Sequence, residues 1–113
     1  MDSDDELRNA VQAGATFAQV RVVAVARDKA GTRSQTAAYE CEVIRAIEGA
    51  LPSPARLKHF GPPMLEAGHL YIVGAIDSRR HHAAWELRFA AAAEADSDQA
   101  AAAFLARRTA LLP

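Results

Sequence analysis

The chain has 113 residues, is 50% hydrophobic and 24% charged, and carries a formal net charge of -1. This length suits one compact domain, and the balanced charge gives no overall electrostatic reason to bind nucleic acid. Alanine supplies 27 of the 57 hydrophobic residues, so only 30 larger apolar residues remain to build a core. The composition argues against a collagen-like, disulfide-rich or wholly disordered chain.

The cysteine content and the N-terminal sequence indicate the cellular compartment in which we expect the protein. Cys41 is the single cysteine, so no intrachain disulfide can form, which fits a reducing compartment. The opening sequence MDSDDELR is acidic and lacks the basic and apolar regions of a secretory signal. No apolar run approaches the roughly 20 residues that span a bilayer. We therefore expect a cytoplasmic protein without membrane contact.

The first elements are marked by a helix cap and a run of β-branched residues. Ser3 and Glu6 have the spacing of a capping box, which predicts a short amphipathic helix over residues 4–13 that ends near Gly14. Valines then predict a first strand over residues 17–27. The polar segment that follows has the composition of a hairpin loop.

The second strand is predicted over residues 35–47 from alternation of apolar and polar residues. Tyr39, Cys41 and Val43 alternate with two glutamates, which is typical of a half-buried strand. The phase slips after Val43, and this predicts a β-bulge or short turn near Ala46.

Three further strands and a C-terminal helix complete the predicted order. Two prolines end a short strand, and Gly74 indicates a bend within the strand that follows it. Asp96 and Gln99 have the spacing of a helix cap, which predicts the start of the C-terminal helix. The predicted ranges are strands over 56–60, 69–76 and 83–91 and a helix over 97–111. The fold class is therefore mainly β: one domain, residues 1–113, built as a small five-stranded antiparallel barrel with an N-terminal and a C-terminal helix that plug or flank it.

Three segments carry a family resemblance. The segments Ala15–Val25, Tyr39–Gly49 and Gly68–Ile76, with the stretches Arg45-Ala46-Ile47-Glu48-Gly49 and Gly68-His69-Leu70-Tyr71-Ile72-Val73, resemble OB-fold proteins of the netrin-like type. The element order is also similar to that of Sm-like barrels, which implies ring formation and RNA binding as an alternative. Neither resemblance assigns a binding residue.

The histidines and the cysteine are the first candidates for chemistry. His59, His69, His81 and His82 lack the spacing of a zinc site, so we expect surface or edge histidines without a metal. Cys41 falls on the apolar face of its strand, which predicts a buried, unreactive thiol. We expect no cofactor, no catalytic residue and no enzymatic activity.

Two loops with basic residues form the candidate binding site. If these loops meet at one end of the barrel, their positive charges can contact a polyanion, while the aromatic residues of the strands are expected mostly in the core. The candidate residues are Arg27, Lys29 and Arg33 in one loop and Arg79, Arg80, His81 and His82 in the other.

The leading functional hypothesis is a non-catalytic binding or assembly module of unknown ligand. The alternative is single-stranded nucleic-acid binding, RNA in particular, by an OB- or Sm-like barrel. A protein partner or self-association is also predicted, because an edge strand of an incompletely closed barrel can pair with another chain. A small enzyme or metal protein that uses the histidines is the third and least favoured hypothesis.

Overall fold

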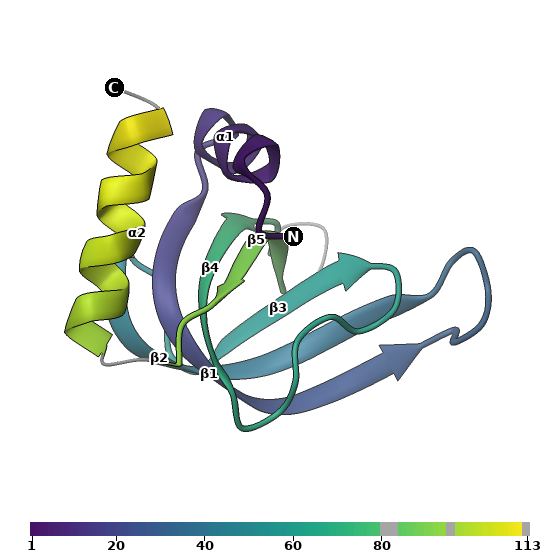
Figure 1. Cartoon of the computed structure of the whole chain (residues 1–113). Helices are drawn as coiled ribbons and strands as arrows, with labels where there is room; N and C mark the ends of the chain where they lie inside the picture. The colour runs from purple at the N-terminus through teal and green to yellow at the C-terminus, as the bar shows by residue number, and fades with distance from the viewer. Residues whose placement is uncertain (80–83, 95–96, 112–113) are drawn as a thin grey trace.

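The computed structural model describes residues 1–79, 84–94 and 97–111, and Figure 1 shows them as a barrel of strands flanked by two helices. The elements in chain order are α1 (Asp4–Gln12), β1 (Thr16–Asp28), β2 (Thr36–Glu48), β3 (Ala55–Phe60), β4 (Leu70–Asp77), β5 (Trp85–Ala92) and α2 (Ser97–Leu111). The predicted order of helix, five strands and helix is confirmed, with each boundary within two residues of its expected position.

The five strands form one sheet that closes on itself. Their order is β1-β2-β3-β5-β4, and β4 pairs in turn with β1. Among the described residues, β3 and β5 run parallel, whereas the other neighbours run antiparallel. The expectation of a wholly antiparallel barrel is therefore wrong at this seam. Strand directions cannot alternate all the way round a closed ring of five, because five is odd.

Apolar side chains pack in two layers, one inside the barrel and one between the sheet and the helices. The inner layer includes Val20, Val22, Tyr39, Cys41, Leu51, Leu57, Leu65, Val73, Trp85 and Leu87. The outer layer is built on Leu7, Phe17, Ile72, Phe89 and Phe104. In the outer layer, the Phe17 and Phe104 ring centroids lie 5.2 Å apart. The helices therefore flank the barrel and do not enter it.

The capping box predicted at the start of α1 is confirmed. The Ser3 hydroxyl accepts from the N–H of Glu6 at 3.1 Å, and the Glu6 side chain accepts from the N–H of Ser3. Burial acts to raise the pKa of Glu6, but the Ser3 hydrogen bonds and the N-terminal ammonium outweigh it and hold that pKa below its usual value. These bonds satisfy backbone donors that the first helical turn leaves free.

The second helix is attached by two apolar residues and by charge. Ala101 and Phe104 are its buried members. Three ion pairs join its ends to β2 and α1: Arg45–Asp98, Arg107–Asp4 and Arg108–Glu48. Within the described residues, no helix combines the length and apolar character needed to cross a membrane.

The phase slip predicted in β2 is present as irregular pairing with β1. Register shifts leave Ile44 and Ile47 as extra residues of β2, on either side of Ala46. The bulge predicted near Ala46 is confirmed. Such bulges increase local twist and bend the strand, which a small closed barrel requires.

Gly74 of β4 lies directly across from Phe17 of β1. A Cβ atom added at Gly74 would lie 2.6 Å from Cε1 of Phe17, which is closer than two carbons can approach. The pairing of β4 with β5 also shifts register between Gly74 and Ala75, at the position where a bend was predicted. Glycine is therefore required here by the ring stacked over it.

We expect Gly74→Ala to lower the free energy of unfolding by about 1–3 kcal/mol, the usual cost of overpacking a core. Urea titration followed by circular dichroism measures this change. Phe17→Leu is the matched control: the double variant should lose less than the sum of the two single losses, because the smaller side chain relieves the clash. Additive losses, or a Gly74→Ala variant as stable as the parent, would contradict this account.

Candidate functional site

A groove of about 420 Å³ lies on the outer face of the sheet, over β1, β2 and β3. Pairing between strands places Ala26, Ala38 and Lys58 in one row across this face. Small side chains therefore form part of the floor, and the neighbouring row across the same face is Ala24, Glu40 and Arg56. The lining residues are Ala24, Val25, Ala26, Asp28, Thr36, Ala38, Tyr39, Glu40, Arg56, Leu57, Lys58 and Ala84.

A bulge in β1 turns the alanines of the floor outward. Val22 pairs with Cys41 and Ala24 pairs with Glu40, so Val23 is the extra residue between them. Before the bulge, the even-numbered residues of β1 point into the barrel; after it, the even-numbered residues are exposed. One inserted residue thus exchanges the two faces of the strand.

The basic side chains divide into those paired within the chain and those left unpaired. The paired group, each within 3.2 Å of a carboxylate, is Arg8, Arg45, Arg79, Arg88, Arg107 and Arg108. The group without an ion pair to any described residue is Arg21, Arg27, Lys29, Arg33, Arg56 and Lys58.

Five members of the unpaired group lie on β3 or on the part of the β1–β2 hairpin beyond Val23. They come from the end of β1, the turn before β2, and β3, and we call them the basic end: Arg27, Lys29, Arg33, Arg56 and Lys58. Two carboxylates, Asp28 and Glu40, share this region, so five cations against two anions leave a formal charge of +3. The whole chain carries -1, so the remaining residues together carry a formal charge of -4.

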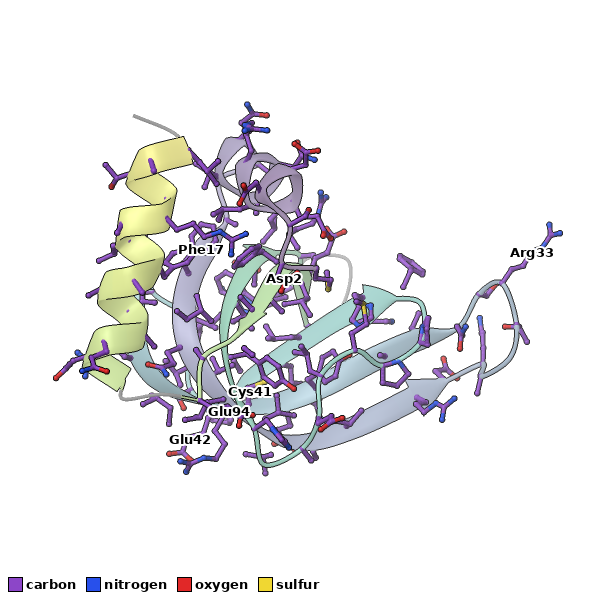
Figure 2. The ribbon with its side chains drawn as sticks, in the orientation of Figure 1. Asp2, Phe17, Arg33, Cys41, Glu42 and Glu94 are labelled. Carbon is purple, nitrogen blue, oxygen red and sulfur yellow. The ribbon has the colours of Figure 1, made fainter. Side chains whose placement is uncertain are left out.

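The first predicted basic loop belongs to the basic end. Lys29 begins the turn with a left-handed backbone, φ 54°, and so ends β1. Figure 2 shows Arg33 at the far tip of the hairpin, directed away from the barrel. Arg27 leaves β1 on the side opposite Ala26 and is exposed.

The second predicted basic loop does not supply a free cation in its described part. Arg79 donates from Nε and Nη2 to Asp77 at 2.9 and 2.8 Å, and its guanidinium lies 5.0 Å from the Trp85 ring centroid. The hydrogen bonds to Asp77, followed by its charge, raise the pKa of Arg79. Arg79 is thus already ion-paired with Asp77 and is not a member of the basic end. The other predicted contacts, Arg80, His81 and His82, lie outside the described residues.

Phe60 is a candidate site residue that the sequence reasoning missed. It is 78% exposed at the end of β3 and follows Arg56 and Lys58 on the same face, because alternate residues of a strand point the same way. The sequence contained an indication of this exposure. If Leu57 faces inward, the alternation of a strand directs Phe60, three residues later, to the outer face. An exposed aromatic ring therefore adjoins two unpaired cations.

A buried hydrogen-bond network supports β3 behind this face. The Tyr39 hydroxyl lies 2.7 Å from Nε2 of His59 and accepts from the N–H of Met64 at 2.9 Å. Nδ1 of His59 donates to the Phe60 carbonyl at 3.0 Å, which leaves Nε2 to accept from Tyr39. Of the two expected positions, surface or edge, the surface is wrong for His59: it is buried, which is possible because both ring nitrogens are satisfied.

His69 occupies a different position, half exposed between two carboxylates. Its Nε2 lies 3.2 Å from Glu66, and its Nδ1 contacts Glu94. In the described ranges, no three His, Cys, Asp or Glu side chains are grouped to hold a metal ion. This arrangement links the segment before β4 to the one after β5.

Cys41 is buried inside the barrel, as predicted. Burial, with a smaller contribution from the charge of Glu40, raises the pKa of its thiol to about 12. The thiol therefore keeps its proton at neutral pH, and the thiolate, which is the nucleophilic form, does not form there.

Comparison with known proteins gives no assignment for this arrangement. No protein-family model matches the chain, and neither a curated protein nor a solved structure is similar to it.

We expect the Cys41 thiol to be unreactive in the native protein at pH 8 and to react once per chain in urea, as measured with a chromogenic disulfide reagent. An unfolded thiol loses its proton near pH 8.5, whereas the native thiol keeps it to about pH 12. The stability that this difference contributes is complete below about pH 8.5 and declines above it. The stability difference between the parent and Cys41→Ala should therefore be constant at neutral pH and fall at alkaline pH. Rapid labelling of the native protein at pH 8 would contradict this.

Proposed function

We propose that this chain is a non-catalytic binding module that holds single-stranded nucleic acid, RNA in particular, on the outer face of β1, β2 and β3. The observation that carries this proposal is that exposed Phe60 shares one face of β3 with Arg56 and Lys58, neither of which has an ion pair to a described residue. Unpaired Lys and Arg side chains contact phosphates, and aromatic rings stack with bases without regard to sequence. Arg56 and Lys58 line the groove and can supply the phosphate contacts, and Phe60 follows them on the same face of β3 and can supply the stacking contact.

The proposal includes an OB-type barrel in preference to an Sm-like one. OB barrels bind oligonucleotides on the face of their second and third strands, between the loop joining strands one and two and the loop joining strands four and five. The groove here lies over β2 and β3, with Asp28 at the first of these loops and Ala84 at the second. This coincidence supports the OB assignment.

The shape of the groove favours a single strand over a duplex. The floor of small alanines lets a flexible backbone approach the sheet, with Arg56 and Lys58 standing at its margin. Bases of a duplex are stacked inside it and cannot reach Phe60, whereas those of a single strand can. Self-association and a cytoplasmic location, both expected from the sequence, stay predictions.

We expect the protein to bind a fluorescein-labelled single-stranded RNA 12-mer, with affinity that falls steeply between 50 and 200 mM salt. Each phosphate contact contributes a slope of about -0.7 in log K against log salt. The Arg56→Gln/Lys58→Gln variant should therefore flatten the slope by about 1.4, as measured by fluorescence anisotropy. Arg21→Gln is the matched control, since it removes an unpaired cation outside the basic end. No binding by the parent protein at 50 mM salt, or equal losses in both variants, would overturn the proposal.

Phe60→Ala should weaken RNA binding roughly 5- to 150-fold, the range for loss of one stacked base. The salt slope should not change, because no charge is removed. Phe60→Trp keeps a flat ring and should retain affinity, which separates stacking from a general effect on the fold. Unaltered affinity of Phe60→Ala would show that the exposed ring is not a stacking platform.

A further inference from the structure

The second half of β1 has a neighbouring strand on only one side. β1 pairs with β4 from Thr16 to Arg21, and Val22 then exchanges backbone hydrogen bonds with Gly68 and His69. From Val23 to Asp28, the described residues provide β2 on one side and no strand on the other. Figure 1 shows this part of β1 and β2 projecting beyond the barrel as a hairpin. Barrel closure thus leaves an open edge.

This edge is accessible and has unpaired backbone groups. Val23 is 58% exposed, and Ala24, Ala26, Arg27 and Asp28 are also exposed. Alternate residues of such an edge direct N–H and C=O groups toward the open side, where an extended segment can hydrogen-bond to them. Small side chains at Ala24 and Ala26 leave room for a neighbouring strand.

We propose that the open edge Val23–Asp28 accepts an extended acidic segment of a partner protein as an added strand. Backbone hydrogen bonds give affinity in this binding mode, and side chains select the partner. Arg21 stands at one end of the edge, and Arg27 and Lys29 stand at the other, none of them ion-paired to a described residue. The fitting segment is therefore apolar in its centre, beside Val23, and carries Asp or Glu at both ends.

The same charges select against a second copy of this chain. Two copies paired antiparallel around Val25 would bring Arg21 of each toward Lys29 of the other. Like charges opposite one another destabilise strand pairing, and charged residues near an edge are a common protection against self-pairing. An acidic partner meets attraction at both ends of the edge.

The experiment uses hydrogen exchange with mass spectrometry on the full chain and a blocked eight-residue peptide, EEVTVTEE. The peptide should slow exchange of backbone amides within residues 23–28, whereas KKVTVTKK, with the same centre and the opposite charge, should not. Arg21→Gln/Arg27→Gln should weaken binding roughly fivefold, the effect of two exposed ion pairs. Both side chains are exposed, so thermal unfolding should be unchanged.

This inference does not depend on RNA binding, and one further variant separates the two. Lys58→Gln should weaken RNA binding but leave peptide binding unaltered, because Lys58 lies on β3 and not beside the open edge. No slowing of exchange in residues 23–28 at millimolar peptide, equal protection by the lysine peptide, or protection that rises with protein concentration alone would each overturn the proposal. The last outcome would indicate self-pairing at this edge.

Discussion

The register of β1 against β2 determines which side chains this molecule shows to solvent, and the bulge at Val23 sets that register. A strand has only two faces, and a single extra residue exchanges them for every position that follows. On one side of Val23 the strand fills the barrel with valines; on the other it offers a floor of alanines. The groove, the open edge and the projecting hairpin all lie beyond this residue.

The charged side chains also differ between the two parts of the molecule, the helices and the hairpin. Near the helices, Arg45, Arg107 and Arg108 form ion pairs that attach α2 to β2 and α1. Each exposed pair contributes little to stability, but a helix with two buried residues has few other constraints on its position. At the hairpin the cations have no such partners in the described chain. The net charge of -1 therefore conceals a formal charge of +3 at the basic end with its two carboxylates and an excess of carboxylates, formally -4, over the rest of the chain.

Local signals in the sequence sufficed for the elements but not for the site. The cap at Ser3 and the bulge near Ala46 depend on residues close together in the chain, and both could be predicted. The parallel seam follows from closing an odd number of strands, which strand patterns alone do not reveal. His59 was misjudged because its burial depends on the hydroxyl of Tyr39, a partner on another strand. Arg79 was predicted to contact a ligand because its ion pair with Asp77 depends on side-chain geometry, which the sequence does not show.

The parallel seam has a mechanical consequence. Among the described residues, β3 and β5 are joined only along Leu57–Lys58 and Trp85–Glu86, whereas every other pair of neighbours shares a longer ladder. Local opening of a protein follows the route that breaks the fewest hydrogen bonds and exposes the least apolar surface. By this criterion we expect the β3–β5 seam, which borders the groove at Leu57, Lys58 and Ala84, to open before the other ladders. Such an opening would separate β3 from β5 beside the groove, while the long β1–β2 ladder would still hold β1 and β2 together.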